Sequence, residues 1–154
     1  MSKYVDKVTY TLDLKDYTDK KITKQLTNEV GQYLVEQILD DVSQSKSPVN
    51  GQRFVGLTKE YKNIKKNYSS STAPNMELTG DLLDSLIFKS KGSKIEVGIF
   101  DFDQAQKADN HNKFSGASKK TSVPKRQFIP YEDQRFRKGI ERSIIEIVKE
   151  IVEN

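Results

Sequence analysis

The spacing of apolar residues changes along this chain, and each spacing is typical of a different secondary structure. Between residues 4 and 14, apolar and polar residues alternate with the period of two expected of a half-buried strand. From Ile22 to Val42, apolar residues recur every three or four positions, which predicts a long amphipathic helix. A chain of 154 residues that contains both patterns is expected to fold as one α+β domain, residues 1–154.

Both patterns return in the second half of the chain. In "LIFKSKGSKIEVGIF" (residues 86–100), two apolar runs flank Gly92, whose permissive backbone suits a tight reversal, and this predicts a β-hairpin. A second long helix is predicted from Pro130, which can occupy a first helical position, to the C-terminus. We expect the N-terminal strand, the hairpin and a short extended piece before Pro130 to form one antiparallel sheet, packed against the two long helices.

Shorter elements are expected between these parts. Apolar residues at helical spacing behind Thr58 predict a very basic helix at residues 58–68, and "LTGDLLDSL" (residues 78–86) predicts a short helix with Thr79 as its N-cap. Residues 101–122 show no periodicity, and we expect them to form a long exposed loop or arm.

Composition excludes several classes of chemistry. The chain has no cysteine, and His111 is its single histidine, so a Cys-His nucleophile and a multi-histidine metal site are impossible. "GASKKTS" (residues 116–122) lacks the second glycine of a phosphate-binding loop. Asp101 and Asp103 offer too few oxygen ligands for a good cation site. We therefore expect no catalytic residue, no metal and no cofactor.

Charge is a weaker indication. The net charge is +4 and the isoelectric point is about 9.1, but 22 acidic residues are interspersed with 26 basic ones. No run approaches the roughly 20 apolar residues that span a bilayer, so we expect no membrane partner. The lysines form two clusters, which can be solvated surfaces or, repeated around a ring, a belt that faces DNA. These clusters are Lys62, Lys65 and Lys66, and Lys119 and Lys120 with Lys125 and Arg126.

Five segments match, in the same order, the motifs of a known family. The first, "PVNGQRFVGLTKEYKNIK", has the spacing G-x-x-F-x-x-L-x-x-x-Y-x-x-x-K from Gly51 to Lys65. It is followed by "MELTGDLLDSL", "IEVGIF", a loop with Ala108, His111 and Gly116, and "VPKRQFIP". From about residue 48 onward the chain thus resembles the tail-completion or virion-morphogenesis proteins of long-tailed bacteriophages, which lie in the neck at the head-tail junction. The His-to-Gly spacing is longer here, and the N-terminal strand and helix match no motif of the family.

The resemblance implies a non-enzymatic structural subunit, made in the host cytoplasm and assembled into the virion. Its copies would form a closed ring, expected to be six- or twelve-fold, that completes or caps the tail and joins it to the head. Neighbouring neck, connector and tail-tube proteins would be its partners, with packaged double-stranded DNA contacted nonspecifically. The candidate subunit-interface residues are His111, Phe114 and Arg126, and the candidate DNA-facing residues are Lys62, Lys65, Lys66, Lys119 and Lys120. The alternative is a small basic nucleic-acid-binding module that uses the helix at residues 58–68.

The stretch "SVPKRQFIPYEDQRF" (residues 122–136) joins the arm to the last helix. Pro124 and Pro130 fix φ and favour extended backbone between them, so Arg126 and Phe128 share one face. We predict that Phe128 is buried between the sheet and the C-terminal helix, with Phe136 in the same core. Arg126 is expected to pair with an acid, within the protomer or across a subunit interface.

Overall fold

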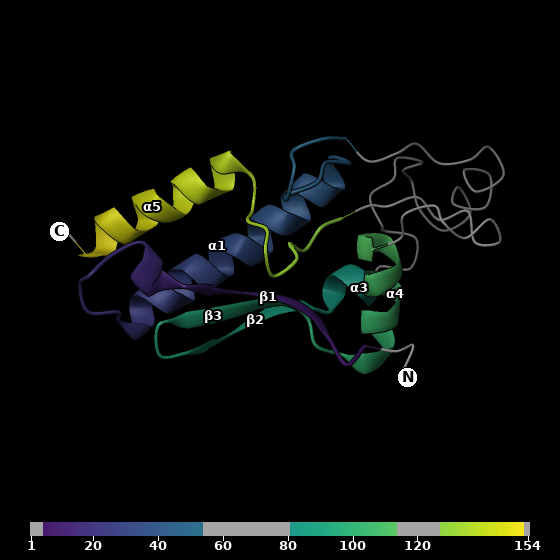
Figure 1. The fold of residues 1–154 in the computed structure, drawn as a ribbon, viewed down its shortest axis with the longest axis horizontal. Helices are drawn as coiled ribbons and strands as arrows, with labels where there is room; N and C mark the ends of the chain where they lie inside the picture. Colours follow the sequence, from purple (N-terminus) through teal and green to yellow (C-terminus); the bar gives the residue numbers. More distant parts are fainter. Residues whose placement is uncertain (1–4, 54–80, 114–126, 153–154) are drawn as a thin grey trace, which may run out of the picture.

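The computed structural model describes residues 5–53, 81–113 and 127–152, and these form a mixed α+β fold, which confirms the predicted class (Figure 1). One antiparallel sheet contains the strands in the order β1-β3-β2. The strands are β1 (Val8–Asp13), β2 (Leu86–Lys91) and β3 (Lys94–Ile99). The helices of the described residues are the 3-10 turn η1 (Leu14–Asp16), α1 (Lys24–Ser43), α3 (Asp81–Asp84), α4 (Phe102–Lys113) and α5 (Lys138–Val152).

Glycines define the predicted hairpin and its place in the sheet. Gly92 has φ +60° in the connection between β2 and β3, where Lys91 pairs with Lys94. Gly98 lies in the central strand β3 with φ +148°, and a Cβ there would overlap the backbone of β1 at Val8 and Thr9. The hairpin is confirmed, and a glycine is required at position 98 by the close approach of β1.

The two long helices lie on the same side of the sheet, with α1 directly against it. Helix α1 packs on β2 and β3, and α5 lies beside α1 (Figure 1). A Cβ on Gly31 of α1 would overlap the ring of Phe88, so this glycine lets β2 approach the helix closely. The fully buried aliphatic residues of these elements form the core: Leu26, Val30, Leu34, Ile38, Val42, Ile95, Val97, Ile99, Ile140 and Ile144.

Helix α1 begins and ends close to the residues that the sequence predicts. Thr23 is its N-cap, and the Thr23 hydroxyl accepts a hydrogen bond of 3.2 Å from the Leu26 N–H. This bond satisfies one of the N–H groups that the first turn of a helix leaves unpaired. The chain after α1 turns at Ser45, whose φ is +60°.

Part of the expected arm at residues 101–122 is a helix, which corrects that prediction. Asp101 precedes α4, and its carboxylate accepts a hydrogen bond of 2.9 Å from the Gln104 N–H. Ala105 and Ala108 are fully buried. The buried face of α4 includes these two alanines and the polar Asn112, which carry little of the hydrophobic signal that periodicity detects. Residues 114–122 lie outside the described residues.

The segment before the last helix also differs from the prediction. Helix α5 begins at Lys138 and not at Pro130, because residues 131–134 form a turn in which the Gln134 N–H donates to the Tyr131 carbonyl at 2.9 Å. Residues 127–130 do not join the three-stranded sheet. The predicted helix at residues 58–68 and the Thr79 cap lie outside the described residues, whereas the short helix that follows them is α3.

Both aromatic residues predicted for the junction core are buried. Phe128 has no exposed surface, and Phe136 is 3% exposed. The ring of Phe136 packs edge to face against Tyr10 of β1, with centroids 5.3 Å apart. These contacts join the chain before α5 to the sheet.

Replacing Phe128 by alanine is expected to lower the free energy of unfolding by about 3–5 kcal/mol, because it leaves a cavity in a fully buried site. Ile145→Ala on α5, where the side chain is 40% exposed, serves as the control and should cost about 0.5 kcal/mol or less. Chemical denaturation of both variants measures the difference. A Phe128→Ala protein as stable as the control would contradict the assignment of this side chain to the core.

Candidate functional site

The sequence-predicted site residues fall mostly outside the described part of the chain. His111 lies in α4, one residue before the buried Asn112. Phe114, Arg126 and all five candidate DNA-facing lysines, Lys62, Lys65, Lys66, Lys119 and Lys120, lie outside the described residues. The described residues instead contain several polar contacts and surfaces that the sequence did not indicate.

Asn112 holds the segment that leads to α5. Its side-chain oxygen accepts hydrogen bonds from the N–H groups of Phe128 and Ile129 at 2.8 and 2.9 Å, and its amide nitrogen donates to the Ile129 carbonyl at 2.8 Å. The Tyr131 hydroxyl donates to the Asn112 backbone carbonyl at 2.7 Å. The buried side-chain amide of Asn112 thus forms the hydrogen bonds with the backbone of Phe128 and Ile129 that a neighbouring strand would otherwise form.

The loop after α1 is bonded to the same segment. The buried Ser47 hydroxyl donates to the Gln127 carbonyl at 2.6 Å and accepts from the Val49 N–H at 3.2 Å. Gly51, the first residue of the family-like motif, has φ +74° and donates its N–H to the Ser47 carbonyl. A positive φ explains why glycine suits that position.

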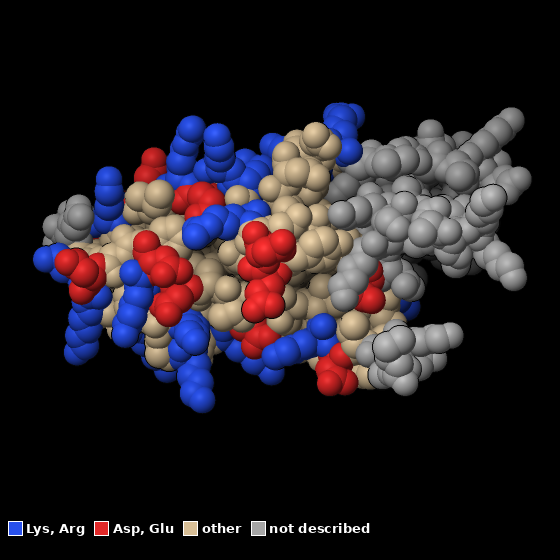
Figure 2. Space-filling view, viewed as in Figure 1, with Lys and Arg blue, Asp and Glu red and all other residues tan. Residues whose placement is uncertain are grey.

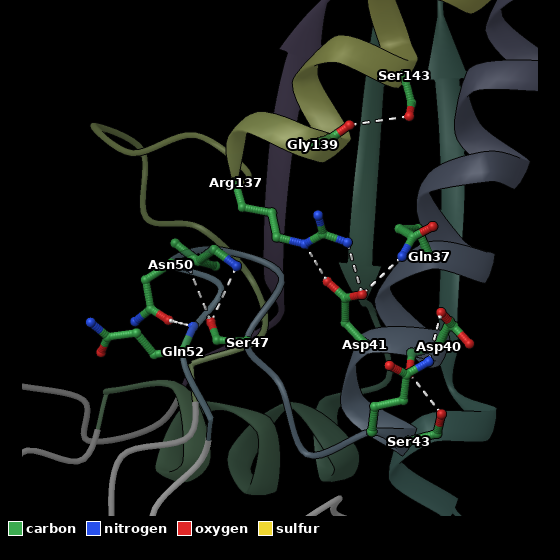
Figure 3. Close-up of polar contacts among 12 residues, drawn as sticks. Gln37, Asp40, Asp41, Ser43, Ser47, Asn50, Gln52, Arg137, Gly139 and Ser143 are labelled. Atoms are coloured by element: carbon green, nitrogen blue, oxygen red, sulfur yellow. Dashed lines mark hydrogen bonds and ion pairs between the residues drawn. The ribbon is translucent and has the colours of Figure 1, made fainter.

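An ion pair joins α1 to the start of α5 (Figure 3). Arg137 donates from Nε and Nη2 to the two carboxylate oxygens of Asp41, at 2.8 and 3.1 Å, and Gln37 donates to Oδ1 at 2.8 Å. The Asp41 side chain is only 3% exposed. Hydrogen bonding to Asp41 raises the pKa of Arg137 above its ordinary value. The sequence indicates this pair only through the position of Asp41, an acidic residue beside Val42 at the edge of the apolar face of α1.

A polar groove of about 500 Å³ lies along β1, an edge strand of the sheet, and Lys94 at the start of β3 is part of its lining. One wall is formed by β1 and η1, and the other by the turn before α5. Tyr17 lies in this groove, and its hydroxyl donates to Oε2 of Glu141 at 2.6 Å. The lining residues are Tyr10, Thr11, Leu12, Asp13, Asp16, Tyr17, Lys94, Glu132, Asp133, Gln134 and Arg135.

Acidic residues outnumber basic ones around the groove. Asp13, Asp16, Glu132 and Asp133 line it, with Lys94 and Arg135 as the cations of that lining. Figure 2 shows acidic side chains on this face, near η1 and near the segment before α5. Burial, followed by the charge of Glu141, raises the pKa of Tyr10 above its ordinary value. The groove therefore favours a cationic ligand over an anionic one.

Hydrogen bonding in the sheet decides which backbone groups point into the groove. Leu14 donates its N–H to the Ser93 carbonyl at 2.9 Å, and these two residues continue the β1–β3 register. Because paired and unpaired positions alternate in an antiparallel ladder, the N–H and C=O groups of Thr9, Thr11 and Asp13 point to the free edge of β1. Thr11 is exposed and lines the groove.

The sheet face opposite α1 carries lysines and an aromatic ring. The Lys89 ammonium lies 4.4 Å from the centre of the Phe100 ring, and Lys7 lies 5.9 Å from it. Lys7 also forms a 2.6 Å ion pair with Glu96 of β3, which accepts a hydrogen bond from Thr9. Burial opposes ionisation of Glu96, but the bonds from Lys7 and Thr9 outweigh it and hold its pKa below its ordinary value.

Comparison with known proteins found no match among family models, curated proteins or solved structures. In the residues that the structure describes, no group of three His, Cys, Asp or Glu side chains is arranged to bind a metal ion. Within the same part of the chain, no helix has the length and apolar character needed to cross a membrane.

Arg137→Ala is expected to lower the free energy of unfolding by about 3 kcal/mol, because it leaves the buried carboxylate of Asp41 without its cation. The double variant Asp41→Asn, Arg137→Ala should be more stable than this single variant, since it removes the unpaired charge as well. Urea denaturation of both, with the exposed Arg142→Ala as control, tests the pair. A double variant less stable than Arg137→Ala would show that the charge on Asp41 is not the cause.

Stability at alkaline pH should depend on Tyr17. Burial and the hydrogen bond to Glu141 raise the pKa of Tyr17, so the folded protein keeps a proton that the unfolded chain loses above pH about 10. The stabilisation that comes from the protonated Tyr17 is fully present below pH about 10 and is lost as the pH rises toward the pKa of Tyr17 in the folded protein. The free energy of unfolding of the wild type should therefore fall more steeply above pH about 10 than that of Tyr17→Phe. Parallel pH profiles for the two proteins would contradict this effect.

Proposed function

We propose that this protein is a structural subunit of a bacteriophage virion that forms a ring at the head-tail junction. In this role it completes or caps the tail and joins it to the head, by shape complementarity and without catalysis. Identical subunits would meet through two different surfaces, a contact that closes into a ring when the rotation between copies allows it. Its further partners would be neck, connector and tail-tube proteins.

One observation carries the proposal: the described parts of four of the five family-like segments, far apart in sequence, lie around the chain that leads to α5, while the fifth segment forms β3 of the sheet. Ser47 bonds to Gln127, and Asn112 bonds to Phe128, while α3 packs against α4 (Figure 1). The motifs are recognised from residue types, spacing and order in the sequence, so the contacts between four of them in the fold are a separate reason to treat these four as one unit. This unit supports a role in subunit contact for the candidates that are close to its segments in the sequence, His111, Phe114 and Arg126.

The rest of the described chain offers a second, different surface. The groove runs along the second half of β1 to η1, with the turn before α5 as its other wall. A subunit with two unlike surfaces suits a head-to-tail contact better than a two-fold one. This supports a ring over a symmetric dimer.

A second candidate function is binding of nucleic acid. It is favoured by the sheet face opposite α1, where Lys89, Lys91 and Lys94 are exposed and the Lys89 ammonium lies over the Phe100 ring. Lysines near an aromatic ring on an open sheet suit contact with phosphates and bases. In the ring, the same face and the lysine clusters at residues 62–66 and 119–120 would contact packaged DNA nonspecifically.

Native mass spectrometry and sedimentation of the full chain should reveal one discrete oligomer whose fraction rises with protein concentration. Arg126→Ala should lower that fraction without changing the melting temperature, whereas the exposed control Arg142→Ala should leave it unchanged.

DNA binding distinguishes the two candidate functions in the same samples. A protein that stays monomeric at every concentration and binds free duplex with an affinity that falls steeply with salt would overturn the ring in favour of the nucleic-acid-binding module.

A further inference from the structure

We propose that the groove along β1 binds an extended, lysine- or arginine-rich peptide segment as an additional strand of the sheet. The partner is thus a protein segment recognised by its backbone and its positive charge. This inference rests on the geometry of the groove and not on the proposed ring.

The first reason is the free edge of β1. Thr11 is exposed, lines the groove and directs its N–H and C=O groups away from β3. Within the described residues, no hydrogen bond to the Thr11 backbone from outside the sheet is found. An edge with unpaired backbone groups accepts an extended peptide through main-chain hydrogen bonds.

The second reason is the contrast between the two edges of the sheet. The edge strand β2 contains Lys89 and Lys91, and lysines on an edge discourage further strands from pairing. The edge strand β1 has the sequence VTYTLD, which contains no lysine, arginine or proline. Of these two edges, β1 is therefore the one suited to receive a strand.

The third reason is the charge and shape of the groove. Asp16, Glu132 and Asp133 are exposed at its walls and would lie near the side chains of a bound strand. Tyr10 and Tyr17 are only partly buried, so their rings offer apolar surface within the groove. Successive side chains of a bound strand point to opposite sides. Every second side chain of the peptide can therefore contact the rings of Tyr10 and Tyr17, and the side chains between them, if basic, can contact the acidic residues.

The test uses a fluorescein-labelled peptide of sequence Lys-Val-Lys-Val-Lys-Val and the full-length protein. Fluorescence anisotropy should show saturable binding that weakens with salt. The acidic analogue Glu-Val-Glu-Val-Glu-Val and a basic peptide N-methylated at alternate residues should each bind at least about tenfold more weakly. Equal binding of the acidic analogue would overturn the charge assignment, and equal binding of the N-methylated peptide would overturn strand addition.

Variants of the protein locate the binding to the groove. Thr11→Pro removes an outward N–H without removing a bond to β3, so it should fold and lose binding, whereas the control Thr11→Val should retain it. Charge reversal by Glu132→Lys and Asp133→Lys should weaken peptide binding about tenfold. Glu146→Lys and Glu150→Lys, on the exposed surface of α5, are the control with the same change of charge.

Folding is checked by thermal melts, and Glu132→Lys with Asp133→Lys decides the result if Thr11→Pro does not fold. Unchanged peptide binding by the folded variants, or no saturable binding to the wild type, would overturn the proposal. If Thr11→Pro lowers the oligomeric fraction while the wild type binds no peptide, the groove takes a second copy and the peptide assignment is wrong. Loss of the ring with intact peptide binding would instead count against the proposed function alone.

Discussion

The buried backbone of residues 127–129 is the constraint on which the rest of the structure depends. This segment carries Phe128 and Ile129 into the core but does not join the sheet, so its polar groups need partners from side chains. Asn112 and Ser47 supply them, from α4 and from the loop after α1. Each unsatisfied group would cost about 1–3 kcal/mol, and these two side chains therefore fix where α4 and the loop lie.

This arrangement explains why the two ends of the molecule differ. At one end, α3, α4 and the loop after α1 surround the entry of the chain that leads to α5 (Figure 1). At this end Arg137 also bonds to Asp41 in the last turn of α1 and to the Pro48 carbonyl. Away from it, the turn before α5 lies beside β1 and η1. The groove is thus a consequence of how the core is closed, and the same closure gives the protomer two unlike surfaces for contact.

The acidic groove and the basic sheet face divide the surface charge in a way that the net charge of +4 conceals. Lys94 belongs to both regions, because it follows the hairpin turn on β3 and pairs with Asp13 of β1, where it lines the groove. A protomer with separate acidic and basic regions can bind unlike partners on different sides, and salt should weaken both contacts.

The sequence by itself determined the elements whose signal is local. Alternation predicted β1, helical spacing predicted α1, Gly92 predicted the hairpin, and the burial of Phe128 followed from its place between two prolines. Only the tertiary structure decided the helix α4, whose buried alanines and Asn112 give no strong hydrophobic periodicity, and the start of α5 at Lys138. It alone also revealed the roles of Asn112 and Asp41 and the groove along β1. These depend on contacts between residues far apart in the chain, and such contacts leave no pattern in the residues next to them.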